Sequence, residues 1–245
     1  QYLPDFNEAS SEVTINVINY ILIPEIQCPS NLIQGTYCYE SPLVGDLVMT
    51  HGIVTHVKSG TYPNFFIQEP GENECGGIYV YDTSVSPTVG DEITLLASVN
   101  EEYSNTELED VISYSIISSG NTINPIPIQT GDLGIDCSLE GEYLEGMLVK
   151  IQNANVESID QYGNVFVNDG SGQTIVDDYH YNNGTFNNIQ IGTTISSIVG
   201  IVGYSFNQFR IYPRDNNDFD SCSTELGDIN GDGGFNVLDI VTLAN

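Results

Sequence analysis

The sequence predicts an all-β protein with two tandem five-stranded barrels, an extra N-terminal strand and a short C-terminal loop followed by a helix. Three observations predict this fold class. Tyr, Val, Ile and Thr are plentiful, which favours strands over helices. Turn residues recur about every 8–12 residues between strand-like runs, a spacing typical of sandwiches and barrels. The chain also contains an internal repeat.

The predicted strands share short apolar and β-branched runs bounded by Gly, Pro, Asn or Asp. No segment before residue 235 has a helical period. In chain order the predicted strands are 13–26, 46–57, 64–68, 77–81, 92–100, 111–117, 147–158, 164–168, 174–177, 194–202 and 208–212.

The repeat relates the two halves of the chain. The segment Asn64–Glu69 recurs as Asn164–Asp169, and Val89–Ile93 recurs as Ile191–Ile195. The order of long strands, short hairpin strands and glycine-marked turns also matches, which favours homology over chance likeness. Two copies of about 100 residues imply two homologous barrels.

These signals divide the chain into five parts. Pro125 and Pro127 lie in the connecting segment, where prolines stiffen a linker. The parts are an N-terminal strand with a disulfide loop (1–43), barrel 1 (44–120), a linker (121–140), barrel 2 (141–221) and a tail (222–245).

The first predicted strand, residues 11–26, precedes copy one and has no counterpart before copy two. It is rich in β-branched residues, so it must be covered. It either pairs with its own barrel or completes the sheet of a neighbouring subunit by strand addition.

The charge excludes some partners. With 34 acids against four bases the net charge is -30, which repels nucleic acid and anionic membrane surfaces. No run reaches the roughly 20 apolar residues that a membrane span needs, so we expect no membrane insertion. The chain opens at Gln1 without Met, as a secreted protein does after signal cleavage, although any trimmed start looks the same. We therefore expect a secreted protein, extracellular or on the surface of a bacterium.

The five cysteines form no CxxC pair, which disfavours zinc and favours disulfides. We expect a bridge between Cys137 and Cys222, both in the second half. One of Cys28, Cys38 and Cys75 is then left over, and their connectivity stays open.

Several segments resemble the OB-fold modules of bacterial secreted proteins that accompany extracellular endonuclease/exonuclease/phosphatase-type nucleases. In copy one these are residues 41–46, 52–55, 65–68 and 77–81, and in copy two residues 142–150 through 213–215. The resemblance covers about residues 26–218 and implies OB-like barrels. The chain departs from nucleic-acid-binding OB domains because Lys58 is the only base in copy one.

The strongest motif is the twelve-residue run 228–239, which matches a calcium loop. Gly233 stands at position six, where the sharp turn needs glycine, and the alternative is an Asp/Gly-rich turn without metal. The predicted calcium ligands are Asp228, Asn230, Asp232, Gly234 through its carbonyl, Asn236 and Asp239. The run resembles one type I dockerin repeat. The resemblance implies a cohesin-like partner, but a complete dockerin has two such repeats and this chain has one. A cell-surface partner is the other expectation.

Catalytic signals are poor, and we expect no enzyme. No HExxH, GxSxG or P-loop motif occurs. His51 and His56 lie five apart on one predicted strand, so they face opposite sides and do not share a metal. The acids at 101–102, 107–110 and 177–178 are expected to be solvated loop faces.

Two functions remain. The first is a non-catalytic secreted structural or adhesive protein, a self-assembling fibre subunit that uses its N-terminal strand for subunit contacts. The alternative is an accessory OB module of a secreted nuclease or other hydrolase, with a dockerin-type attachment tail.

Overall fold

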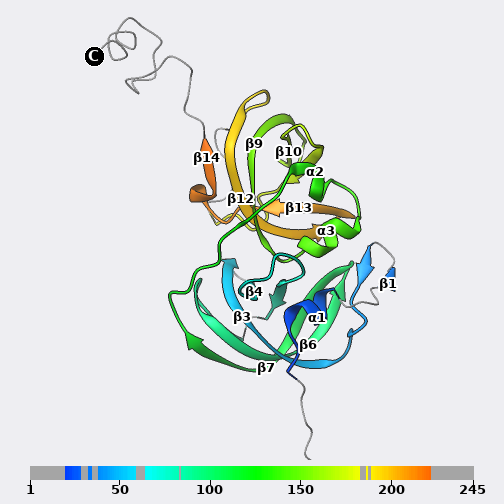
Figure 1. The fold of residues 1–245 in the computed structure, drawn as a ribbon, viewed down its shortest axis with the longest axis vertical. Coiled ribbons are helices and arrows are strands. Elements are labelled where there is room, and N and C mark those ends of the chain that lie inside the picture. Colours follow the sequence, from blue (N-terminus) through cyan, green and yellow to red (C-terminus); the bar gives the residue numbers. More distant parts are fainter. Residues whose placement is uncertain are drawn as a thin grey trace, which may run out of the picture.

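The computed structural model describes residues 20–28, 33–34, 38–58, 64–82, 84–182, 186 and 189–221. Strands dominate this part of the chain, so the all-β prediction is confirmed (Figure 1). The predicted calcium loop 228–239, Cys222 and residues 11–19 of the predicted N-terminal strand lie outside the described residues.

The first half forms a closed five-stranded barrel in the order β3-β4-β5-β7-β6. All pairings are antiparallel except that of β5 with β7. The first half of β3 pairs with β6 and its second half with β4, so one bent strand closes the barrel. The strands are β3 (Leu47–Lys58), β4 (Asn64–Gln68), β5 (Gly77–Tyr81), β6 (Glu92–Glu102) and β7 (Asn105–Ser118).

The second half forms a seven-stranded sheet in the order β14-β12-β13-β11-β10-β9-β8, with a further pairing of β12 with β9. The pairings among β9 to β13 therefore run in the same order as those of the barrel, and β11–β13 is parallel like β5–β7. The strands are β8 (Ile126–Pro127), β9 (Leu148–Ile159), β10 (Val165–Asn168), β11 (Gln173–Val176), β12 (Thr194–Ser205), β13 (Gln208–Tyr212) and β14 (Phe219–Ser221).

Each half has a tight two-residue hairpin at the same place in this order. Tyr103 and Ser104 join β6 to β7 with φ of 54° and 60°, and Phe206 and Asn207 join β12 to β13 with φ of 53° and 61°. Positive φ at both central residues is typical of a type I′ turn, whose twist matches that of the strands. β6 therefore extends past the predicted strand 92–100 to Glu102, and β7 begins at Asn105, well before the predicted strand 111–117.

The prediction of a strand through residue 26 is wrong at its C-terminal end. Residues Ile23–Gln27 form the helix α1, with Pro24 in the first turn, where proline is tolerated. Ile23 and Ile26 lie three residues apart on one face, and both are fully buried in the barrel core. Just ahead of α1, Tyr20 forms an isolated parallel bridge with Met49 of β3.

The segment expected as a linker carries regular structure on the second sheet. β8 pairs with β9, and α2 (Thr130–Leu133) contacts β10 and β11. Helix α3 (Leu139–Leu144) follows, with the Ser138 hydroxyl capping its first turn. The remaining short elements are β1 (Ile33–Gln34), β2 (Tyr39–Glu40) and the 3-10 helix η1 (Asn216–Asp218). Helices this short give no sequence period, which is why none was predicted before residue 235.

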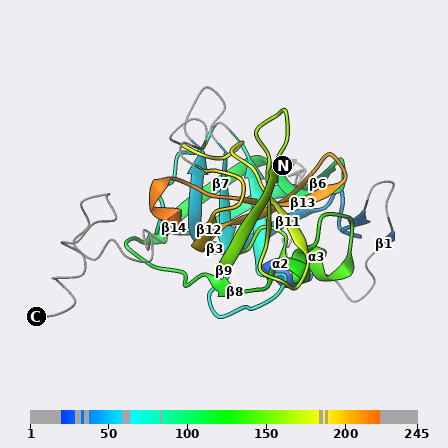
Figure 2. The same ribbon diagram turned by 90° about the horizontal axis from the view of Figure 1, so that it is seen from above.

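The barrel and the second sheet lie one above the other along the long axis, as the two views together show (Figures 1 and 2). Each has its own core, and a third buried cluster of Phe66, Leu148 and Ile201 joins them. No helix in the described ranges is both long and apolar enough to cross a membrane.

Candidate functional site at the junction of the two sheets

The backbones of the two halves touch at a pair of glycines. A Cβ on Gly77, at the start of β5, would lie 2.1 Å from the carbonyl carbon of Gly146, just before β9. Beside this contact, the Cys75 amide donates to the Tyr143 carbonyl at 2.6 Å. The two backbones approach so closely that only glycine fits at either position, and the two halves are in direct contact at this point.

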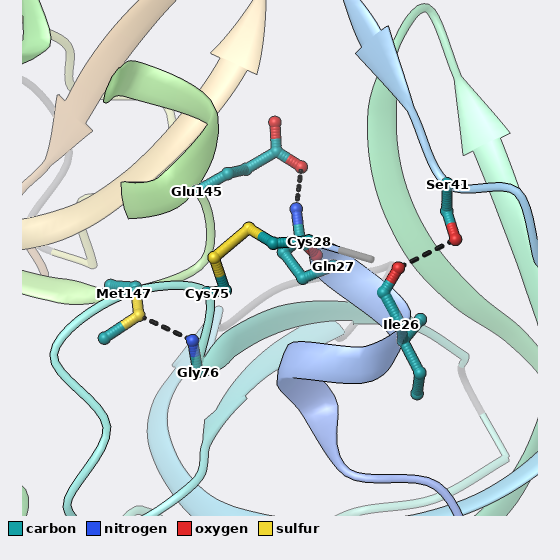
Figure 3. The surroundings of a disulfide bond; sticks show 8 residues. All are labelled: Ile26, Gln27, Cys28, Ser41, Cys75, Gly76, Glu145 and Met147. Atoms are coloured by element: carbon teal, nitrogen blue, oxygen red, sulfur yellow. Dashed lines mark hydrogen bonds between the residues drawn. A yellow bond between two sulfur atoms is a disulfide. The ribbon is translucent and has the colours of Figure 1, made fainter. Parts of the chain in front are cut away.

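Two disulfides join segments that are distant in sequence. Cys28 bonds Cys75, which ties the end of α1 to the loop before β5 (Figure 3). Cys38 bonds Cys137, which ties the segment before β2 to the α2–α3 connection. The predicted Cys137–Cys222 bridge is therefore wrong. Cys38 packs with the core of the second sheet, so the fold brings it to Cys137 across 99 residues of sequence.

A cluster of carboxylates is buried where the end of α3 meets the β6–β7 hairpin. Glu145 is 2% exposed and Glu142 fully buried, both near the end of α3, and Glu101 and Glu107 approach from β6 and β7. One oxygen of Glu145 accepts from Gln27 Nε2 at 3.0 Å (Figure 3) and from the Thr106 amide at 2.9 Å. Its other oxygen, and both oxygens of Glu142, have no hydrogen-bond partner.

Burial raises the pKa of every member of this cluster, because a charged carboxylate loses its hydration there. The pKa of Glu142 rises to about 10, with a further contribution from the negative charge of Glu145. Burial likewise raises the pKa of Glu145 and Glu107 to about 8 and that of Glu101 to about 7. The cluster therefore holds protons near neutral pH, and a protonated carboxyl can both donate and accept.

The carboxylate cluster does not form a metal centre. Within the described ranges, no three His, Cys, Asp or Glu side chains are arranged to hold a metal ion. The prediction that the acids at 101–102, 107–110 and 177–178 are solvated is wrong for Glu101, Glu107 and Asp177, although Glu102 and Asp110 are exposed. Glu107 and Asp177 are buried and Glu101 is half-buried, because the β6–β7 hairpin and the second sheet enclose them.

A pair of buried histidines, one from each half, also lies at the junction. His56 of β3 and His180 of the loop after β11 have ring centroids 5.7 Å apart, and Phe66 and Tyr79 pack on His180. Burial lowers the pKa of His56 to about 4, and it lowers that of His180 as well. Both rings are therefore neutral at pH 7 and serve as packing groups.

Three of the four bases are engaged in internal contacts. A base held this way has less to offer a phosphate. The contacts are Arg210 Nη1 to Asp177 Oδ2 at 2.6 Å, Arg214 Nη2 to Asp218 Oδ1 at 2.7 Å, Arg214 Nη1 to the Thr55 carbonyl at 3.0 Å, and Lys58 Nζ to the Tyr179 ring centre at 3.2 Å.

The predicted and observed sites differ in place. All six predicted calcium ligands, residues 228–239, lie outside the described residues. The sequence did separate His51 from His56: His51 pairs with the Tyr20 hydroxyl, and His56 faces inward. The junction itself was missed. Its only sequence signals were a glycine at the start of one strand and a glycine before another, with acids in apolar surroundings.

Known proteins give little guidance. No protein-family model and no curated protein matches the chain. Among solved structures, a tetrameric HIN2 domain is 11% identical over 69% of this chain and 91% of its own, with a TM-score of 0.34. A HINb domain is 13% identical over 66% and 90%, with a TM-score of 0.31.

A protein from Leishmania major Friedlin described as an aspartyl-tRNA synthetase is 13% identical over 52% of this chain, with a TM-score of 0.30. The chain spans only 26% of that protein. At these TM-scores the similarities carry no argument about function.

Proposed function

We propose that the chain is a secreted, non-catalytic structural or adhesive protein whose copies self-assemble into an extracellular fibre through the N-terminal segment. The observation that carries the proposal is the clamp of the two halves into one block. Cys38–Cys137 and the Gly77–Gly146 contact join the first half to the second, and Cys28–Cys75 ties α1 to the first half's own barrel. A subunit that transmits force along a fibre gains from such covalent closure.

The two disulfides indicate an oxidising environment, since thiols stay reduced in the cytosol. The large negative charge favours the same role. A surface with net charge far from zero keeps single copies soluble and limits contacts to uncharged patches.

Two finer features belong to the same proposal. The shared order of strand pairings supports tandem OB-like barrels, in which the second sheet is a copy of the first. The loop 228–239 holds one calcium ion through Asp228, Asn230, Asp232, Gly234, Asn236 and Asp239, as its spacing predicts. Calcium there would stabilise the tail.

The alternative is an accessory module of a secreted nuclease or other hydrolase, attached through the dockerin-like tail to a cohesin-like partner. It predicts binding to single-stranded DNA, and the proposal predicts none. A gel shift at low salt separates the two, since binding through phosphates weakens steeply as salt is added.

The proposal is tested on the full chain and on a chain lacking residues 1–19. This deletion spares Tyr20 and the buried Ile23 and Ile26, so the barrel core stays intact. We expect sedimentation and electron microscopy to find fibres of the full chain, and the shortened chain to be a folded monomer. A full chain that stays monomeric at high concentration overturns the proposal, and so does a shortened chain that still forms fibres.

A further inference from the structure

One side of β7 has no partner strand beyond its first few residues. β7 pairs with β6 at residues 105–109 and again from Ser113 to Ser118, but with β5 only at Glu107–Glu109. At Asp110 the backbone turns, with φ of 51°, and the Val111 amide donates to Asp82 Oδ2 at 2.7 Å. From Ile112 to Ser118 the described part of the chain supplies no second strand. In Figure 1 this strand curves along the lower side of the barrel. An edge of this kind offers a row of unpaired backbone groups to another strand.

The side chains on this edge are apolar and exposed. Ile112 is 64% exposed, Tyr114 38%, Ile116 49% and Ile117 57%. Proteins usually protect an exposed edge with charges, prolines or bulges. The pairing with β6 does shift register between Glu109 and Ser113 and between Ile116 and Ser118. None of the residues from Val111 to Ser118, however, is charged or proline. The edge therefore has the composition of a strand that is covered in the working state of the protein.

Charge identifies what can cover this edge. A second copy carries the same net charge of -30, so it can approach closely only through an uncharged segment. Residues 13–24 are uncharged and rich in β-branched side chains, and seven of them, 13–19, precede Tyr20. Seven extended residues span about 23 Å, which exceeds the length of the edge from Ile112 to Ile117.

Within one copy, strands β3 and β6 separate the N-terminal segment from the free edge of β7. Tyr20 bridges Met49 of β3, Met49 pairs with Leu96 of β6, and Leu96 pairs with Ser113 of β7. The chain thus enters at one edge of this part of the sheet, and the free edge of β7 is the opposite one. A contact between opposite edges of two copies is head-to-tail, and it propagates when the rotation does not close.

We propose that residues 112–117 of β7 accept residues 13–19 of a second copy as an added strand. The inference rests on the proposed self-assembly and names the surface that receives the N-terminal segment. Backbone pairing supplies the affinity, and the apolar side chains on both strands supply register.

The acceptor is tested in the full chain with the double variant Ile112→Glu/Ile116→Glu. Its matched control is Val89→Glu/Ile191→Glu, which adds the same two charges at residues 58% and 63% exposed, both in turns. The edge variant should raise the concentration needed for assembly about tenfold or more, which corresponds to about 1.4 kcal/mol. The control should assemble like the unchanged chain.

Mixing gives the sharper result. A donor variant, Ile15→Glu/Val17→Glu, keeps its β7 edge, and the acceptor variant keeps its N-terminal segment. Each should be monomeric alone, and an equimolar mixture should form dimers and nothing larger. In the unchanged assembly, the amides of residues 112–117 should exchange more slowly than in the donor variant, a readout that does not depend on the acceptor variant folding.

The outcomes separate the two proposals. If the unchanged chain does not assemble, the proposed function fails. If the unchanged chain, the control and the edge variant all assemble alike, or if amide exchange at 112–117 is the same in assembly and monomer, the edge of β7 is not the acceptor and this inference alone is overturned.

Discussion

Replacing Glu142 by glutamine should stabilise the protein, and the gain should grow with pH. The carboxylate is fully buried, neither oxygen has a hydrogen-bond partner, and burial raises its pKa from 4.5 to about 10. The folded state must therefore hold this group protonated at pH values where the unfolded chain ionises it. Glutamine keeps the shape and has no proton to hold.

The magnitude follows from the pKa. A raised pKa costs nothing below 4.5, and the cost grows by about 1.4 kcal/mol for each pH unit above it, up to the folded pKa. We expect Glu142→Gln to change the free energy of unfolding by less than about 1 kcal/mol at pH 5 and by about 3 kcal/mol at pH 7. Stability of the unchanged chain should accordingly fall as pH rises through this range.

The assay is urea unfolding at pH 5, 6, 7 and 8 with the disulfides intact. Glu140→Gln is the matched control, because Glu140 lies on the same helix and is exposed. The control should change stability by no more than about 0.5 kcal/mol at every pH. A Glu142→Gln variant that gains the same at pH 5 as at pH 8, or that loses stability at pH 8, would refute the reasoning.

The remaining predictions concern the clamp, the histidines and the tail. Replacing Cys38 and Cys137 together by serine should lower the free energy of unfolding by about 4 kcal/mol, since the bridge closes a loop across 99 residues, and a loss under 1 kcal/mol by urea titration would contradict this. Gly77→Ala should cost more than about 2 kcal/mol and reduce the yield of folded protein, because its Cβ meets backbone; an unchanged melting temperature would show that the halves separate there. Burial lowers the pKa of His56 from 6.5 to about 4, so the free energy of unfolding should decrease as pH falls through this window. His56→Phe should remove that decrease. An equal dependence of the free energy of unfolding on pH in both chains below pH 6 would contradict it. Calorimetry should detect one calcium ion per full chain and none after Asp228→Ala, and a heat that survives the substitution would place the ion elsewhere.

The sequence predicted the strands well where periodicity and turns agreed. All-β content and a closed five-stranded barrel follow from the β-branched runs and their spacing, and most strand centres match. The hairpin at Tyr103 and Ser104 was missed because neither residue is the glycine or asparagine that usually marks a type I′ turn. The asparagine of the equivalent turn, Asn207, does follow this preference.

The junction could not be predicted, because it depends on contacts between distant residues. Cys38 was grouped with the first half by sequence position, yet it packs in the core of the second sheet and bonds Cys137. Acids such as Glu142 look solvated in sequence because carboxylates are rarely buried without a partner. Helix α1 was predicted as strand because it follows a run of β-branched residues, and Pro24 was the one residue that indicated the end of that strand.

Sedimentation velocity of the full chain over a hundredfold range of concentration, with and without residues 1–19, tests the central claim most directly. The account predicts that the full chain shifts to large, polydisperse species as concentration rises while the shortened chain keeps the sedimentation coefficient of a folded monomer. A single monomeric species for both chains across the whole range would contradict it.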